Sequence, residues 1–147
     1  MLVRYEPDLT NTIKDSLQTV QAFQFESDET LLYIESQSIN LKNQAEPLFQ
    51  ESVEGVLKKF EASGARNIIT KQEEFTSANG VKGARMYGSG IFSIPDSNKT
   101  VKGKYSIMLF GGPGFQQIVV ISWLDEDEYA EQIAERIMKT LEIRTQT

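Results

Sequence analysis

The chain is poor in the side chains that perform acid–base or nucleophilic chemistry. Its 147 residues include no histidine and no cysteine. Histidine is the usual proton-transfer group near neutral pH, and the thiolate of cysteine is a strong nucleophile and metal ligand. Their absence excludes catalytic triads built on histidine, thiol chemistry and zinc–thiolate sites. We therefore predict that the protein is not an enzyme. An enzyme that works through carboxylates with tyrosine or lysine is kept as an alternative.

Two glycine-rich stretches have some likeness to phosphate-binding loops. Residues 83–90 (GARMYGSG) lack the lysine that a Walker A loop carries after its second glycine, and they have the pattern of a strand. Residues 111–114 (GGPG) lie between two predicted strands, and Pro113 has no N–H to donate to a phosphate. We interpret the first stretch as part of a strand and the second as a turn, and we predict no cofactor.

The carboxylates do not have the spacing of a metal site or a catalytic pair. Residues 125–128 (DEDE) are consecutive, whereas a calcium loop spaces its oxygen ligands around a glycine. Acidic residues are favourable at the N-terminus of a helix, and Asp125 with Glu128 has capping-box spacing. Glu73 and Glu74 are neighbours in a predicted strand, so their side chains point to opposite faces. We predict that residues 125–128 begin a helix and that the chain has no metal site.

The charge distribution argues against nucleic acid and membrane partners. The net charge is −6, and the 15 lysines and arginines form no basic run. No apolar stretch approaches the roughly 20 residues that span a bilayer, so we expect no direct membrane insertion. Residues 1–8 contain no apolar leader segment and no lipobox cysteine. The protein is expected in the cytoplasm if Met1 is the native start, and in the cell envelope or periplasm if a leader has been removed.

The hydrophobic periodicity predicts one α+β domain over residues 1–147, with its core at about 20–143. Strands are predicted at 2–5, 20–25, 30–39, 67–75, 81–94, 104–110 and 115–123, and helices at 43–63 and 125–141. Pro47 fits the first turn of the first helix, and Gly64 fits a left-handed cap after its end. The expected fold is a twisted, mainly antiparallel sheet flanked by helices.

The hairpin around residues 111–114 divides the sheet into two faces. A four-residue turn there pairs Phe110 with Phe115, Ile107 with Ile118 and Tyr105 with Val120. The face with Tyr105 and Ile107 is almost wholly apolar, so we expect a helix to cover it. We interpret the glycines at 88 and 90 as a flat spot beneath large neighbouring side chains.

The opposite face is mixed, and we predict that it binds another protein or a peptide. Its candidate anchors are Arg85, Tyr87, Lys104 and Trp123, because arginine, tyrosine and tryptophan are common where binding energy concentrates. The predicted function is a non-catalytic protein- or peptide-binding module. The alternative is a carrier of a small apolar ligand, with a pocket between sheet and helix. Four aromatic residues would line that pocket: Phe49, Phe60, Phe92 and Tyr105.

This order of elements resembles a known α/β/α sandwich family. The likeness lies in the helix around 47–60, the meander through GARMY at 83–87, the hairpin 105–109/117–123 and the YAEQIAERI segment at 129–137. The family includes the photosystem II extrinsic protein PsbP, the bacterial envelope lipoprotein DcrB and a yeast Ran-binding nuclear import factor. The resemblance covers about residues 20–143. It implies a PsbP-like fold, a bacterial protein, and a role as an assembly factor or chaperone-like accessory protein. DcrB-like members carry a lipobox cysteine that this chain lacks.

Overall fold

The computed structural model of the chain describes residues 2–5, 17–26, 32–41, 49–93 and 98–143. These residues form the predicted order of elements, β-β-β-α-β-β-β-β-α. The elements are β1 (Leu2–Tyr5), β2 (Leu17–Glu26), β3 (Tyr33–Leu41), α1 (Phe49–Ala62), β4 (Arg66–Thr76), β5 (Lys82–Ser93), β6 (Thr100–Gly112), β7 (Phe115–Leu124) and α2 (Glu128–Thr140). The predicted start of the first helix, with Pro47, lies outside the described residues.

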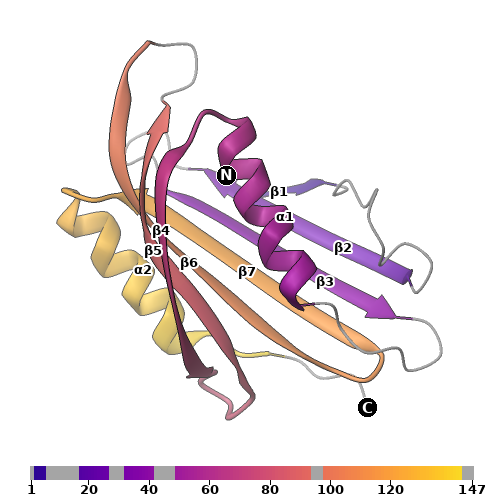
Figure 1. Cartoon of the computed structure of the whole chain (residues 1–147). Coiled ribbons are helices and arrows are strands. Elements are labelled where there is room, and N and C mark those ends of the chain that lie inside the picture. The colour runs from indigo at the N-terminus through magenta and orange to yellow at the C-terminus, as the bar shows by residue number, and fades with distance from the viewer. Residues whose placement is uncertain (1, 6–16, 27–31, 42–48, 94–97, 144–147) are drawn as a thin grey trace.

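The strands form one antiparallel sheet with the order β1-β2-β3-β7-β6-β5-β4 (Figure 1). Two meanders, β1–β3 and β4–β7, join into this sheet where β3 pairs with β7. The prediction of an α+β fold with a mainly antiparallel sheet is confirmed. Among the described strands, β1 and β4 form the edges of the sheet.

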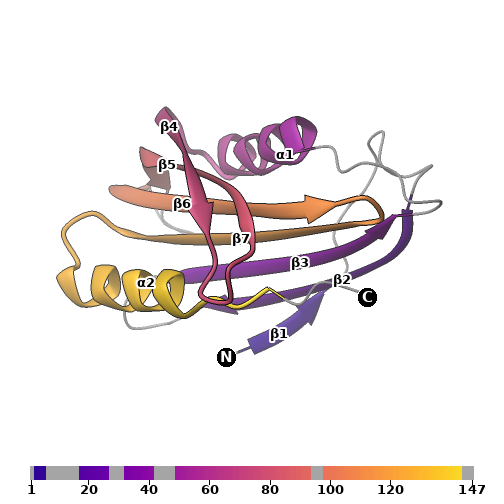
Figure 2. The same cartoon turned by 90° about the horizontal axis from the view of Figure 1, so that it is seen from below.

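One face of the sheet, here termed the α1 side, lies under α1 (Figure 2). Val53 and Val56 of α1 are buried against the strands. The buried core on this side comprises Ile39, Leu41, Val53, Val56, Tyr105, Ile107, Leu109, Ile118 and Val120. The prediction that the face with Tyr105 and Ile107 carries a helix is confirmed.

The opposite face, termed the α2 side, is covered by α2 (Figure 2). Its buried core comprises Leu32, Met108, Phe110, Val119, Ile121, Trp123, Ala130, Ala134 and Ile143. Ala130 and Ala134 are fully buried, and their small side chains let the helix lie close to the strands. α2 therefore covers the part of the mixed face that β6 and β7 form. β4, by contrast, is exposed along nearly its whole length.

The hairpin between β6 and β7 has a shorter turn than predicted. β6 continues to Gly112, which pairs with Phe115, so only Pro113 and Gly114 form the turn. Ile107 consequently pairs with Val120, and Tyr105 with Ser122. The predicted pairing was wrong by two residues. Because side chains alternate with a period of two, this shift leaves every residue on its predicted face.

The ends of the helices are closed by local hydrogen bonds. Gly64 has a φ of 100°, and the N–H groups of Gly64 and Ala65 donate to the carbonyls of Glu61 and Phe60, which confirms the predicted left-handed cap. α2 is capped by Asp127, whose carboxylate accepts from the N–H of Ala130 at 3.0 Å. The capping role predicted for Asp125 was wrong, because Asp125 lies in the turn before the cap and its carboxylate contacts Lys104 instead.

The segment after α2 is fastened to the turn between β4 and β5. Asn79 donates from Nδ2 to the carbonyl of Ile143 at 2.8 Å and accepts from the N–H of Ile143 at 3.1 Å. The N–H of Ala78 donates to the carbonyl of Leu141 at 2.7 Å. Asn79 and Gly80, predicted as a hairpin turn, therefore also hold the C-terminal side of α2 in place.

Candidate functional site

Trp123, one of the four predicted binding residues, lies in the core. It is the last residue but one of β7, lies beneath α2 and is 6% exposed. Its indole is buried among apolar side chains on the α2 side, so it is held by packing within the chain. Sequence alternation placed Trp123 on the mixed face correctly, but the pattern carried no information about which part of that face α2 covers.

Lys104 joins β6 to the beginning of α2. Its Nζ lies 3.0 Å from Oε1 of Glu131 and 3.4 Å from Oδ1 of Asp125. The hydrogen bond to Glu131 raises the pKa of Lys104 above its ordinary value, and the charge of Glu131 and the contact with Asp125 act in the same direction, against the desolvation of the ammonium group. Two carboxylates at the N-terminal end of α2 thus hold Lys104 in place.

Arg85 and Tyr87 lie side by side on β5, on the α2 side. The guanidinium carbon of Arg85 lies 4.4 Å from the centre of the Tyr87 ring, which is the geometry of a cation–π contact. Nη1 of Arg85 donates to Oε1 of Glu73 at 2.7 Å, and Nε donates to Oγ of Ser106 at 2.7 Å. The guanidinium is therefore held in one orientation while Arg85 and Tyr87 both remain partly exposed.

The neighbouring strand β4 extends this surface to the edge of the sheet. Lys71 pairs with Tyr87 and Glu73 pairs with Arg85, so these residues share the α2 side. Ile69 pairs with Ser89 on the same side and is 60% exposed, which is unusual for a large apolar side chain. We term this set the β4–β5 surface: Ile69, Lys71, Glu73, Arg85 and Tyr87. Of the predicted binding residues, the structure brings together Arg85 and Tyr87 here.

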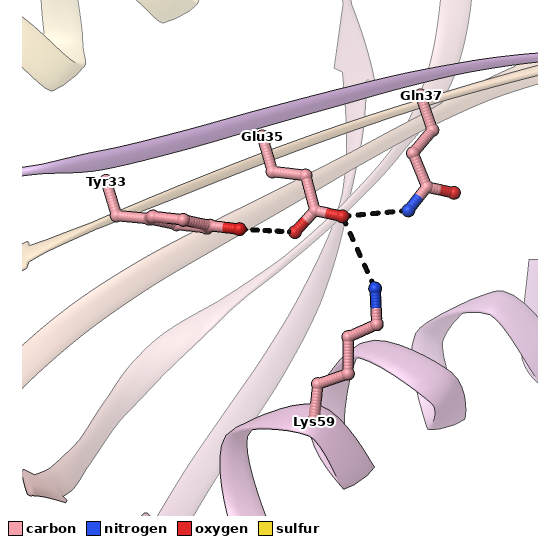
Figure 3. A network of polar contacts seen from close by, with 4 residues as sticks. All are labelled: Tyr33, Glu35, Gln37 and Lys59. Carbon is pink, nitrogen blue, oxygen red and sulfur yellow. Dashed lines mark hydrogen bonds and ion pairs between the residues drawn. The ribbon is translucent and has the colours of Figure 1, made fainter. Parts of the chain in front are cut away.

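The second polar cluster lies on the α1 side and was not found from the sequence. Glu35 of β3 is 5% exposed, and its carboxylate accepts from the hydroxyl of Tyr33 and from Nε2 of Gln37, both at 2.8 Å (Figure 3). Nζ of Lys59 on α1 lies 3.5 Å from Oε1 of the same carboxylate. A buried carboxylate needs such partners, because burial without them is very costly.

The Glu35 cluster connects α1 to β3. Tyr33, Glu35 and Gln37 alternate along one strand face, and Lys59 reaches them from the helix with half of its side chain exposed. The alternation in the sequence could have shown that the three strand residues share a face, but only the packing of α1 brings Lys59 to them. The Glu35 carboxylate thus has hydrogen-bond partners from β3 and an ion-pair partner from α1. We interpret the cluster as a structural contact that holds α1 to the sheet.

The aromatic residues predicted to line a ligand pocket lie in the core on the α1 side. The Phe60 ring packs edge-on against Phe92 and Tyr105, with centroid distances of 5.5 and 5.4 Å. The hydroxyl of Tyr105 donates to the carbonyl of Ile69 at 2.9 Å and shares a hydrogen bond with Thr70. Phe49 packs against the same core. These four side chains belong to the layer between α1 and the sheet.

The described residues offer no cluster of three or more acidic side chains suited to a metal ion. Neither α1 nor α2 has the length and apolar character needed to cross a membrane. Comparison with known proteins adds no family: no family model, curated protein or solved structure matches the chain.

Proposed function

We propose that this chain is a non-catalytic protein-binding module that contacts its partner through the β4–β5 surface. The observation that carries the proposal is the ordered Arg85–Tyr87 pair, which stays partly exposed beside the exposed strand β4. Side chains that are already held in place lose less conformational entropy on binding than mobile ones. Arginine and tyrosine are also among the residue types that contribute most to protein interfaces.

The charges around this pair favour a partner segment that carries carboxylates. A guanidinium has five N–H donors, and the contacts of Arg85 with Glu73 and Ser106 leave donors for a further acceptor. Lys71 lies beside Tyr87 and forms no ion pair with another described residue, so with Arg85 it outweighs the single carboxylate of Glu73. This region is cationic in a chain whose net charge is −6.

We also propose that the chain belongs to the PsbP/DcrB-like family and acts as an assembly factor or chaperone-like accessory protein. One helix on each face of an antiparallel sheet is the layer order that this family leads one to expect, and it supports the proposal. A binding surface formed by strands at one end of the sheet would suit a protein that holds a segment of another chain.

The proposal is tested by identifying the partner and then changing the two central residues. The full chain is used to capture proteins from its native host, and the affinity of the captured partner is measured by titration calorimetry. Arg85→Ala and Tyr87→Ala should each weaken binding at least about tenfold, as is usual at central interface residues, while the melting temperature changes little. Arg136→Ala is the matched control, because Arg136 is exposed on α2.

Unchanged affinity in both variants, with the folded state intact, would exclude the β4–β5 surface as the binding site. A loss of affinity with Arg136→Ala equal to that with Arg85→Ala would show that overall charge, not the ordered Arg85–Tyr87 pair, determines binding.

A further inference from the structure

The strand β4 presents an open edge. Among the described strands it is the last of the sheet and pairs only with β5, so one row of its backbone N–H and C=O groups has no described strand beside it. Such an edge is a template for pairing with another strand. β4 is also exposed on both faces over most of its length, and Ile69 projects from it with 60% of its surface accessible. No described element covers this edge, so it is open to pairing with a further strand.

The sequence of β4 is complementary to itself when read in the opposite direction about Gln72. Placed antiparallel against a second copy with Gln72 opposite Gln72, Lys71 faces Glu73 of the second copy, and Glu73 faces its Lys71. Ile69 then faces Phe75. Opposite charges and apolar pairs directly across two strands both stabilise a sheet.

The faces of the sheet restrict the possible registers. The odd-numbered residues of β4 from Ile69 to Phe75 lie on the α2 side, because they pair with Ser89, Tyr87, Arg85 and Gly83. A two-fold axis perpendicular to the sheet keeps each face continuous, so odd residues must face odd residues.

The neighbouring registers that meet this condition are unfavourable. A register centred on Lys71 sets the two lysines against each other and Ile69 against Glu73. A register centred on Glu73 sets two carboxylates against each other and Lys71 against Phe75. Like charges directly opposite destabilise a sheet. Only the register centred on Gln72 matches charge with opposite charge and apolar with apolar.

The regular part of β4 has the extent that this pairing needs. Asn67 has a φ of 55°, and the register between β4 and β5 shifts between Arg66 and Ile69. Such an irregularity bends the strand and ends regular pairing there. From Ile69 to Thr76 the pairing with β5 is continuous, and this stretch contains every residue from Ile69 to Phe75 that the self-complementary register uses.

We propose that two copies of the chain associate through β4, antiparallel and with Gln72 opposite Gln72, so that their sheets become continuous. The interface covers the exposed Ile69 with Phe75 of the second copy. It also extends the ion pair between Arg85 and Glu73 into a row that continues to Lys71 of the second copy. The inference rests on the edge of the sheet and does not require the proposed partner of the β4–β5 surface.

The oligomeric state is measured on the full chain by sedimentation velocity over a range of concentrations. The wild type should form a dimer that weakens as salt is raised, because ion pairs contribute to it. Lys71→Glu and Glu73→Lys should each be monomeric alone, since each places like charges opposite one another. An equimolar mixture of the two variants should form a dimer, because their charges then match across the edge.

The register is tested by disulfide formation. The chain has no native cysteine, so Gln72→Cys introduces a lone thiol at the two-fold axis. Mild oxidation should convert this variant to a covalent dimer. Glu74→Cys is the matched control on the same face of β4; its two copies lie too far apart in this register to form a disulfide, so it should stay largely unlinked.

Three results would overturn the proposal. One is a wild type that remains monomeric at every concentration. Another is a mixture of the charge variants that remains monomeric while both variants keep the circular dichroism spectrum of the wild type. The third is equal cross-linking of Gln72→Cys and Glu74→Cys. Arg85→Ala and Tyr87→Ala leave the paired edge in place, so a failure of the proposed function would not change these measurements.

Discussion

At the scale of single residues, Gly88 shows how closely the strands approach one another. It pairs with Tyr105, whose hydroxyl reaches across it to the carbonyl of Ile69 on β4. A Cβ at position 88 would lie 1.8 Å from that carbonyl oxygen. The flat spot expected from the sequence is therefore present at Gly88, and backbone from β4 approaches it together with the Tyr105 side chain.

Gly88→Ala should therefore destabilise the fold. The added methyl group must displace backbone, and overpacking of this kind costs about 1–3 kcal/mol in the free energy of unfolding. Gly55→Ala in α1 is the matched control, because nothing lies within 4 Å of its Cβ position. It should stabilise the protein by up to about 1 kcal/mol, since glycine weakens a helix interior. Urea unfolding of both variants checks this pair, and a Gly88→Ala variant as stable as wild type would contradict it.

The predicted binding residues illustrate what a pattern of single residues can reveal. The alternation along β5 correctly placed Arg85 and Tyr87 on one face, and their contact follows from that spacing. The same alternation grouped them with Trp123, which lies in the core. The pattern along a strand gives the face of each residue, but the cover over that face depends on where α2 packs, and this is a tertiary property.

At the scale of elements, α2 shows why helix boundaries are difficult to predict. Four consecutive acidic residues, 125–128, lead into its first turn, and each is favourable near the positive end of the helix dipole. The cap is decided by backbone geometry: Asp127 is extended, with φ −90° and ψ 91°, and its carboxylate reaches the N–H of Ala130. Spacing alone favoured Asp125, whose side chain turns to Lys104 on β6 instead.

Asp127→Ala should cost about 1 kcal/mol in the free energy of unfolding, because the helix loses its N-cap. Asp125→Ala should cost less, since it removes one partly exposed ion pair and Lys104 keeps Glu131. Thermal or urea unfolding of the two single variants compares these losses directly. If Asp125→Ala were the more damaging variant, the cap would have been assigned to the wrong residue.

The strand elements were predicted more completely than their pairing. The β6–β7 hairpin was placed correctly, yet its turn has two residues where four were expected. The glycines at 111 and 112 suit a turn as single residues, but both extend β6 in the fold. Because the error was an even number of residues, the face beneath α1 was still identified, which explains why a wrong register gave a correct core.

At the scale of the whole molecule, the antiparallel sheet and the presence of two helices were predictable from periodicity. The placement of one helix on each face was expected from the resemblance to an α/β/α sandwich and not from periodicity. The Glu35 cluster and the docking of the C-terminal segment on Asn79 were not predicted. Each depends on contacts between different elements, which the periodicity along one element does not show. The edge position of β4 belongs to the same class, because it follows from the pairing of β3 with β7.

Two neighbouring residues of β6 connect the layers of the molecule and should give it a common response to alkaline pH. Lys104 points to the α2 side and holds Glu131, while Tyr105 points to the α1 side and holds β4. Burial raises the pKa of the Tyr105 hydroxyl above its ordinary value, against the effect of its bond to Thr70. The hydrogen bond to Glu131 raises the pKa of Lys104 in the folded state.

Both raised pKa values mean that the folded chain keeps protons that the unfolded chain has lost. Unfolding then releases protons. The contribution of these two groups to the free energy of unfolding is fully present below their unfolded-state pKa values of about 10, and it is lost as the pH rises through their folded-state pKa values. The melting temperature should therefore decline above about pH 10. Tyr105→Phe and Lys104→Met each remove one of the titrating groups, so each should make this decline shallower. Both variants should also be less stable than the wild type at neutral pH. Tyr129→Phe is the matched control, because Tyr129 is 66% exposed on α2, and it should leave the decline unchanged. If Tyr129→Phe flattened the decline as much as Tyr105→Phe, the assignment of the decline to the group that joins β6 to β4 would be wrong.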